Sequence, residues 1–206
     1  MKVQIPKSVR TGRRAIAGAT LLEVLVAILI LSIGLLGVAG LQAASLRFAQ
    51  GSWARAGVAS ALSSLAERVR SNPDSSTTAY LLGASYAAQR TAIDASSLTS
   101  AKNCDSEVCD PAQLAEFQMV GWRLAMDASL PGAAGFVTGD RATGYQATIM
   151  WFDRSYTTKS AAVEALVTSA AKQCAGTETG IAERTCCPAA ANAPAGVRCT
   201  NFTVVP

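Results

Sequence analysis

The longest apolar stretch of this 206-residue chain lies near its N-terminus. Residues 24–41 read VLVAILILSIGLLGVAGL, and Ser32 is the only polar side chain among them. Eighteen helical residues rise about 27 Å, close to the ~30 Å hydrocarbon core of a bilayer. The first 14 positions hold five basic residues and no acidic ones, which by the positive-inside rule places the N-terminus in the cytoplasm. We therefore expect a single membrane-spanning helix and an external C-terminal part.

The helical pattern continues beyond the apolar run. Larger apolar residues recur at spacings of one helical stripe, with small residues between them: Leu46, Trp53, Leu62, Leu65 and Val69. Such a stripe is typical of an amphipathic helix that packs on a core. Asn72-Pro73 supplies a stop, because a proline disfavours the helical conformation of the residue before it. The pattern predicts one helix over about residues 20–71, whose first half lies in lipid and whose second half packs on a globular domain.

The next segment predicts a loop followed by a capped helix. Residues 72–103 are rich in Ser, Thr and Ala and predict a loop with one short helix. Asp110 is a natural N-cap, and Pro111 fits the first helical position. The apolar face of this helix is expected at Leu114, Phe117, Gly121 and Leu124, with Trp122 and Met126 beside it. Leu130-Pro131-Gly132 should end the helix.

Strand patterns dominate the sequence that follows. Phe136-Val137 opens strand-like sequence, and residues 144–154 predict the clearest strand because apolar residues alternate along one side of it: Tyr145, Ala147, Ile149 and Trp151. We expect a helix over Val163–Ala171 and a terminal strand over Asn201–Val205.

Composition argues against catalysis. Histidine is absent, which excludes Ser-His-Asp and Cys-His nucleophile systems and every metal site that needs a histidine. Acidic residues show no recognisable acid–base spacing. Beyond the basic head, 13 basic residues face 14 acidic ones, so bulk charge does not favour nucleic acid. We expect no enzyme activity, no cofactor, no metal and no direct nucleic-acid partner.

Glu23 is an acidic residue at a position where a charge is unfavourable. It stands directly before the apolar run, and a carboxylate carried to mid-bilayer costs about 2.5–3.5 kcal/mol. The simplest alternative is a cleaved secretory signal peptide, for which Gly37-Val38-Ala39 would serve as a small-x-small cleavage site. Glu23 argues against that alternative and in favour of a positively charged partner, such as an amine created by proteolysis a few residues upstream.

The residues Gly18-Ala19-Thr20-Leu21-Leu22-Glu23-Val24 resemble the class III signal of type IV prepilins. The resemblance implies that prepilin peptidase removes residues 1–18 by cutting between Gly18 and Ala19, and that the Ala19 amine is methylated. It implies that Glu23 pairs with the terminal amine of a neighbouring subunit. Residues 19–71 would then form the long helix, with a transmembrane half at 24–41, and residues 72–206 would form a periplasmic headgroup.

The N-terminal helix departs from that of major pilins in one respect. Major pilins commonly carry a helix-breaking proline near the middle of this helix, whereas no proline occurs here between Pro6 and Pro73. Gly34, Gly37 and Gly40 recur instead. Glycine weakens a helix by about 0.8–1 kcal/mol relative to alanine, and it also permits close helix–helix approach. The sequence leaves both roles open.

A second motif set resembles the PilV-type minor pilins, also called type IV pilus modification proteins. It combines two cysteines five positions apart, the run Asp-Pro-Ala-Gln-Leu-Ala, a Trp-bearing helix, Leu-Pro-Gly and a strand ending Trp-Phe-Asp-Arg, all within residues 13–154. The resemblance implies an α+β pilin-like fold, in which a long helix packs on a small antiparallel sheet.

The same resemblance implies a role and a location. The role is assembly or initiation of the pilus with other minor pilins and the major pilin, and so adhesion, twitching motility or DNA uptake. The location is the inner membrane first and the pilus at the cell surface afterwards. Two alternatives stay open: a minor pseudopilin of a type II secretion system, and a signal-anchored periplasmic thiol protein.

All six cysteines lie beyond the membrane segment, where an oxidising compartment favours disulfides. Cys104 and Cys109 form the simplest pair. The other four permit three pairings, of which a bond between the adjacent Cys186 and Cys187 is the most strained. We favour Cys174 and Cys199 each bonding to one of the adjacent two. A zinc site is disfavoured, because only Cys104 and Cys109 approach the spacing of a zinc knuckle.

Overall fold

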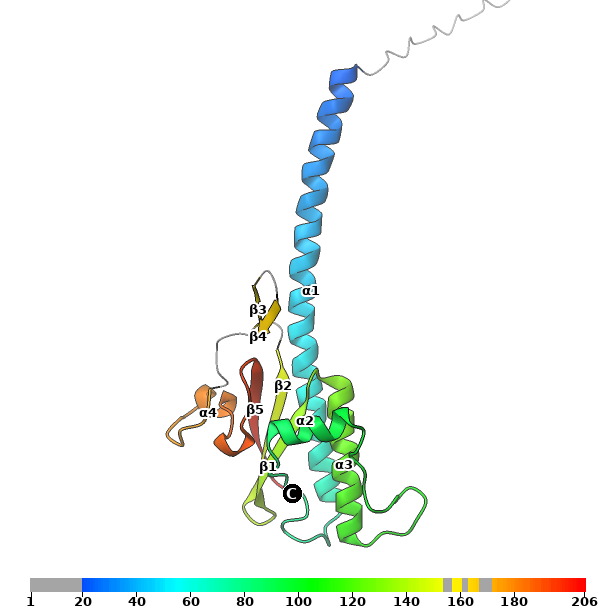
Figure 1. Cartoon of the computed structure of the whole chain (residues 1–206), viewed down its shortest axis with the longest axis vertical. Helices are drawn as coiled ribbons and strands as arrows, with labels where there is room; N and C mark the ends of the chain where they lie inside the picture. Colours follow the sequence, from blue (N-terminus) through cyan, green and yellow to red (C-terminus); the bar gives the residue numbers. More distant parts are fainter. Residues whose placement is uncertain (1–19, 154–156, 161–162, 167–171) are drawn as a thin grey trace, which may run out of the picture. The chain divides into compact units, whose positions relative to one another are not determined.

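The computed structural model describes residues 20–153, 157–160, 163–166 and 172–206, and it shows the expected α+β fold, with a long N-terminal helix and a small antiparallel sheet (Figure 1). Contacts divide the chain into two units, Met1–Ala49 and Gln50–Pro206, and we call the second the C-terminal unit. The described helices are α1 (Leu21–Ser71), α2 (Tyr86–Asp94), α3 (Pro111–Ser129) and α4 (Ile181–Thr185), with a short 3-10 helix at Ala189–Ala191. The described strands are β1 (Ala134–Asp140), β2 (Gly144–Phe152), β3 (Thr157–Ser160), β4 (Val163–Leu166) and β5 (Val197–Val204).

Helix α1 has the predicted limits to within one residue. Its interior contains no proline, and its last turn carries Arg68 and Arg70, whose positive charges complement the negative end of the helix dipole. Arg141, from the turn between β1 and β2, closes the same end. Its Nη2 lies 2.8 Å from the carbonyl oxygen of Asn72 and 3.2 Å from that of Val69. Backbone carbonyls that the helix itself leaves unpaired thus find a donor.

The main sheet has the strand order β1-β2-β5, and both pairs are antiparallel. The alternating side chains expected to share one side of β2 are all buried: Tyr145, Ala147, Ile149 and Trp151. The terminal strand was expected over Asn201–Val205 and begins four residues earlier, at Val197.

A second, two-stranded sheet corrects one expectation. Val163–Ala171 was predicted as a helix, but Val163–Leu166 form β4 and pair antiparallel with β3; residues 167–171 lie outside the described residues. Pairing with the neighbouring strand Thr157–Ser160 satisfies the backbone groups of these four residues directly, and strand formation depends on such a partner more than on the local pattern.

The core of the C-terminal unit lies between the second half of α1, α3 and the inner face of the main sheet. Helix α1 contributes its line of buried residues: Val58, Ala61, Leu65 and Val69. Leu65 and Val69 belong to the predicted stripe, but Leu46 and Trp53 are 66% and 68% exposed. At 100° per residue, Trp53 lies about 120° around the helix from Leu65. The predicted stripe was therefore too wide, and Trp53 stands outside the core.

Helix α3 begins as predicted but buries a different face. The carboxylate of Asp110 accepts hydrogen bonds from the backbone nitrogens of Ala112 and Gln113, both at 2.9 Å. The buried residues are Ala115, Met119, Trp122 and Met126, whereas Leu124, expected on the core face, is 45% exposed. Both sets have helical spacing, so periodicity alone did not choose between them. The indole nitrogen of Trp122 donates to the carbonyl oxygen of Ala61 in α1 at 2.8 Å.

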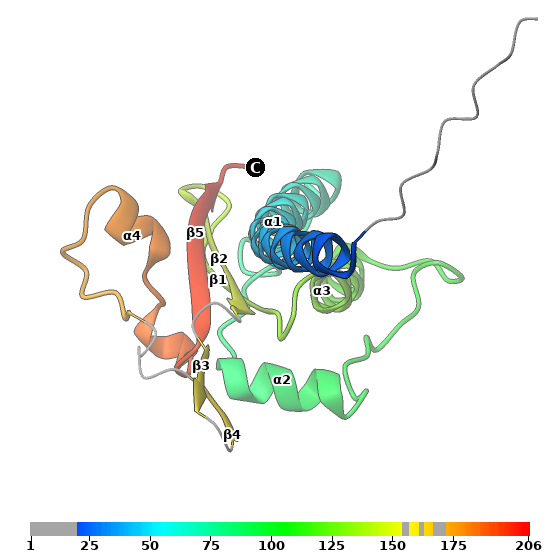
Figure 2. The same ribbon diagram turned by 90° about the horizontal axis from the view of Figure 1, so that it is seen from above.

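The outer face of the main sheet is covered by the C-terminal tail, which we define as residues 172–196, directly before β5. Within the C-terminal unit, Figure 2 shows the sheet between α3 on one side and α4 with its loops on the other. The outer face and the tail share a second buried cluster: Ala134, Phe136, Met150, Cys187, Ala191, Val197 and Cys199. The sheet is consequently buried on both faces, which a strand pattern with one apolar side did not predict.

Candidate functional site

The first turn of α1 is capped by Thr20. The backbone nitrogen of Glu23 donates to the carbonyl oxygen of Thr20 at 3.0 Å and lies 3.3 Å from its hydroxyl oxygen. The first N–H groups of a helix have no carbonyl acceptor within the helix, and a side-chain oxygen at the N-cap can accept a hydrogen bond from one of them. This role of Thr20 was not predicted, although a threonine three residues before a glutamate is a recognised start signal for a helix.

Glu23 lies in this first turn and is exposed. The positive end of the helix dipole stabilises a carboxylate at this place. No cation among the described residues forms an ion pair with Glu23. The cleavage and methylation residues Gly18 and Ala19 lie outside the described residues, so their roles stay predictions.

The helix that follows Glu23 presents apolar side chains on all sides. Every residue from Leu21 to Leu46 is exposed. The hydroxyl of Ser32, the polar residue within the run, donates to the carbonyl oxygen of Ile28 at 2.7 Å, so it presents no unpaired donor to lipid. Among the described residues, α1 is the one helix long and apolar enough to cross a membrane. Such a surface requires lipid or other helices around it.

The three glycines of this run have open space beside them. A Cβ atom placed on Gly34, Gly37 or Gly40 would meet no described atom within 4 Å. No steric contact within the described part of the chain therefore requires glycine at these positions. They lie on one helical face, where small residues let another helix approach closely.

The six cysteines form three disulfides, Cys104–Cys109, Cys174–Cys186 and Cys187–Cys199, with Cα–Cα distances of 5.6, 4.9 and 5.2 Å. The two tail disulfides have the pairing favoured from sequence, in which each of the adjacent cysteines bonds to a different partner. Cys199 lies in β5, so its bond to Cys187 fixes the tail to the main sheet. Within the described part of the chain, no group of three or more candidate ligands is arranged to hold a metal ion.

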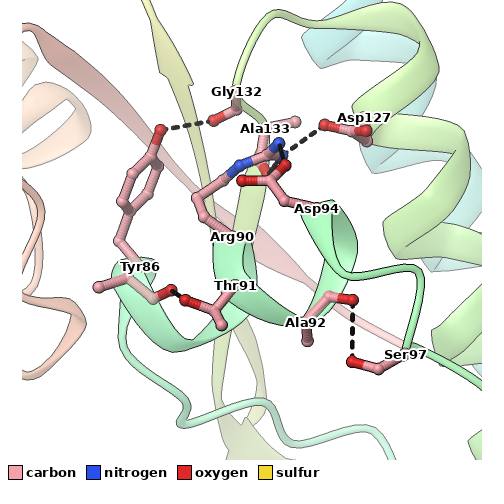
Figure 3. A network of polar contacts seen from close by, with 10 residues as sticks. Tyr86, Arg90, Thr91, Ala92, Asp94, Ser97, Asp127, Gly132 and Ala133 are labelled. Carbon is pink, nitrogen blue, oxygen red and sulfur yellow. Dashed lines mark hydrogen bonds and ion pairs between the residues drawn. The ribbon is translucent and has the colours of Figure 1, made fainter.

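A polar network ties α2 to the rest of the C-terminal unit (Figure 3). The guanidinium of Arg90 contacts Asp94 at 2.6 Å, the carboxylate of Asp127 in α3, and the carbonyl oxygen of Ala133 at 3.1 Å. Burial disfavours the charged guanidinium, but the hydrogen bond to Asp127 and the two carboxylates outweigh this cost and raise the pKa of Arg90. The hydroxyl of Tyr86 donates to the carbonyl oxygen of Gly132 at 2.8 Å. The network holds α2 beside β1.

Residues 13–39 match the family model described as the prokaryotic N-terminal methylation motif. The match includes Gly18, Ala19, Glu23 and most of the apolar run, and it covers 27 of the 206 residues. It supports a type IV pilin-like or pseudopilin protein. No curated protein and no solved structure is similar enough to the chain to count as a match.

Proposed function

We propose that this chain is a minor pilin of the PilV type that takes part in assembly of a type IV pilus. One observation carries the proposal: a methylation motif leads into a helix whose residues 21–46 are all exposed and mostly apolar, and Glu23 lies in the first turn of that helix. The order is leader, assembly helix and folded C-terminal unit. The PilV-type assignment itself rests on the resemblance of residues 13–154 to that group.

The proposed mechanism is assembly without chemical turnover. Prepilin peptidase cuts between Gly18 and Ala19, and the new amine of Ala19 becomes methylated. Glu23 then attracts the amine of a neighbouring subunit, because opposite charges interact strongly where water is scarce. Contacts between helices replace contacts with lipid as the subunit leaves the inner membrane for the fibre, where it joins other minor pilins and the major pilin.

A minor pseudopilin of a type II secretion system is the second candidate, since the methylation motif supports both classes equally. Loss of the gene would distinguish them: a pilus role predicts loss of surface pili and twitching, and a secretion role predicts retention of exported enzymes in the periplasm. A thiol-active protein is disfavoured, because all six sulfurs are paired in disulfides.

The experiment that tests the proposal separates processing from assembly. Gly18→Val should leave a precursor about 18 residues longer, as measured by intact mass and N-terminal sequencing, whereas Gly12→Val within the leader should be processed. Glu23→Ala should be processed and inserted, but the amount of this variant in sheared pili should fall at least about tenfold. The reason is that the terminal amine of the neighbouring subunit loses the negative charge with which it pairs.

The control for Glu23 is Glu67→Ala, which removes an exposed acid from the second half of the same helix. Normal incorporation of Glu23→Ala into pili would contradict the pairing. A mature protein that begins after Ala39, or one that keeps Met1, would refute the proposed function altogether.

A further inference from the structure

Helix α3 carries a positive charge that the described part of the chain does not pair. Arg123 is half-buried, and its Nε is buried without a hydrogen-bond partner among the described residues. Burial lowers the pKa of Arg123, because no nearby acid offsets the loss of water around the charge. The two acids of α3 are engaged elsewhere: Asp127 contacts Arg90, and Glu116 accepts a hydrogen bond from the backbone nitrogen of Ala101. The guanidinium is therefore available to an anion from outside the chain.

Helix α4 presents the complementary charge. The carboxylate of Glu183 is exposed and forms no hydrogen bond or ion pair with another described residue. The other charge of α4, Arg184, lies about 100° further around the helix. Ile181 is 81% exposed in α4, and Leu124, next to Arg123 in α3, is 45% exposed. Each surface thus combines an exposed apolar side chain with a charge, and the two unpaired charges are opposite.

A row of contacts crosses the C-terminal unit from α3 to β5. The indole nitrogen of Trp122 donates to the carbonyl oxygen of Ala61 in α1 at 2.8 Å, and its ring lies against Gly135 in β1. In the main sheet, Gly135 lies opposite Ile149, and Ile149 lies opposite Thr200. The row therefore joins α3 to β5 at the height of Ala61 along α1.

Arg123 and Glu183 lie at the two ends of this row. Arg123 follows Trp122 in α3. The carbonyl oxygen of Glu183 accepts a hydrogen bond at 2.6 Å from the side chain of Asn201, which follows Thr200 in β5. Figure 2 shows α3 and α4 on opposite sides of the main sheet. The two charges consequently lie at similar heights on opposite flanks of the C-terminal unit.

The far end of β5 gives the same height. Arg70, near the end of α1, donates to the carbonyl oxygen of Val205 at 2.9 Å. Asn201 precedes Val205 by four residues, which is about 13 Å of strand, and 13 Å of helix is about nine residues. Counting nine residues back from Arg70 again gives Ala61. Two copies whose α1 helices lie parallel and side by side therefore bring α3 of one to the height of α4 of the other.

We propose that α3 of one copy docks on α4 of a second copy of this chain, where Arg123 pairs with Glu183 and Leu124 covers Ile181. Opposite charges attract more strongly where a contact excludes water. The two surfaces differ, so the contact is heterologous and can repeat from copy to copy. This inference rests on the proposed function, in which neighbouring copies hold their α1 helices parallel.

Photo-crosslinking in cells tests the contact directly. The full chain would be produced in a bacterial inner membrane with prepilin peptidase and no other pilin, with p-benzoylphenylalanine in place of Leu124. We expect a crosslinked dimer whose mass-mapped peptide from the second copy contains Ile181 and Glu183. The same photo-reactive residue in place of Val108, which is 91% exposed, should give no such peptide, although random collisions would favour the more exposed position.

Charge exchange provides the second arm. Glu183→Arg should lower the dimer yield roughly fivefold, as should Arg123→Glu. The double variant should recover most of the yield, which a merely structural effect of either change would not do. Asp74→Arg, which reverses an exposed acid elsewhere in the C-terminal unit, should leave the yield unchanged. If Arg123→Glu does not accumulate, Glu183→Arg decides alone, because its position is exposed.

The possible failures are distinguishable. Absence of the dimer, a dimer mapped to any other peptide, or an unchanged yield for Glu183→Arg would overturn the inference. Leader removal is measured in the same cells, and it changes neither α3 nor α4. An unprocessed chain that forms the mapped dimer therefore counts against the proposed function alone, and a processed chain without the dimer counts against the docking alone.

Discussion

The side-chain amide of Asn201 joins three parts of the C-terminal unit. Its nitrogen donates to the carbonyl oxygens of Glu183 at 2.6 Å and Cys186 at 2.9 Å, both in the tail. Its oxygen accepts a hydrogen bond from the hydroxyl of Thr148 in β2 at 2.7 Å. One residue of β5 thereby connects the neighbouring strand with α4 and its flanking turn.

Asn201→Ala should consequently destabilise the protein by about 2 kcal/mol, since it leaves the buried hydroxyl of Thr148 and two tail carbonyls without a partner. The measurement is urea unfolding of the full chain in detergent, followed by tryptophan fluorescence. Thr203→Ala is the matched control, because the Thr203 hydroxyl bonds to Gln146 at the surface. Equal losses for the two variants would show that the amide does not hold the tail.

The contribution of the turn between β1 and β2 to the stability of the fold depends on pH through the carboxyl group of Asp140. Its carboxylate oxygen accepts hydrogen bonds from the backbone nitrogen and hydroxyl of Thr143 and from the backbone nitrogen of Ala142, at 2.8, 3.0 and 2.8 Å. These bonds stabilise the charged form and lower the pKa of Asp140. A carboxyl with a lowered pKa stabilises the folded protein above its ordinary pKa of about 4 and loses this effect as pH falls through its folded value.

Asp140→Asn should therefore lower the free energy of unfolding near pH 6, and the difference from the unmodified protein should shrink as pH falls below about 4. Unfolding curves collected from pH 6 to pH 2.5 measure this. Asp74→Asn, at an exposed acid whose carboxylate accepts no hydrogen bond from a described residue, should show no such convergence. A pH-independent difference for Asp140→Asn would assign its effect to the turn geometry alone.

Between elements, β1 approaches α3 closely at Gly135. A Cβ atom on Gly135 would lie 2.6 Å from both Cη2 and Cζ3 of Trp122. The indole cannot move away easily, because it is fully buried and bonded to the carbonyl oxygen of Ala61. Glycine at this position of β1 thus lets the strand and the helix meet.

Gly135→Ala should destabilise the protein by about 1–3 kcal/mol through overpacking. Gly83→Ala, where the added carbon would meet nothing within 4 Å, should leave the unfolding midpoint nearly unchanged. In the double variant Trp122→Phe, Gly135→Ala, the smaller ring removes the clash, so the two losses should not add. Additive losses of stability would show that the indole ring of Trp122 does not determine the distance between β1 and α3.

At the scale of elements, the sequence predicts where a helix begins and ends better than it predicts which face of the helix is buried. Helix α1 was predicted over about 20–71 and α3 from Asp110 onward, because a proline and a capping carboxylate act locally. The buried face of α3 was placed on Leu124 rather than Met126, since helical spacing defines a face but not the neighbour that covers it. β4 was missed because its partner strand, not its own four residues, decides its conformation.

At the scale of the whole molecule, the cysteines explain why the tail was harder to predict than the rest. Helix α4 buries none of its own residues, so the tail is held by its two disulfides and by the few apolar residues it places on the sheet. The sequence favoured the pairing that the structure shows, yet it gave no sign that the tail covers Phe136 and Met150. That contact joins residues 37 or more positions apart, and no local pattern records it.

The candidate functional residues also include some that the sequence locates and some that only the packing of the structure reveals. Glu23 stands out in the sequence because it is a charged residue directly before an apolar run, whereas the cleavage and methylation at Gly18 and Ala19 are implied by the resemblance to prepilins. Trp53 was placed in the buried stripe, because its helical spacing fits a core residue equally well, but it is 68% exposed. Only the packing of Leu65 and Val69 shows which side of α1 faces inward.

The packing of α1 decides where the molecule can be divided. The headgroup was predicted over residues 72–206, with the second half of the long helix packed on it, and contacts group residues 50–206 together. Four side chains of α1 lie in the main core, and two of them, Leu65 and Val69, are fully buried. The carbonyl oxygen of Ala61 also accepts the hydrogen bond from Trp122.

A fragment of residues 50–206, exported to the periplasm, should therefore fold and unfold cooperatively, whereas a fragment of residues 72–206 should not. Burying a Val or Leu side chain contributes about 1.5–3 kcal/mol, so loss of this helix removes a large part of a total stability of about 5–15 kcal/mol. It also leaves the Trp122 indole nitrogen without its acceptor in α1 and removes one of the acceptors of Arg141, the carbonyl oxygen of Val69. Thermal unfolding followed by near-ultraviolet circular dichroism distinguishes the two fragments. A sharp transition in residues 72–206 would mean that α1 only tethers the sheet, and that its apolar face contributes to assembly rather than to folding.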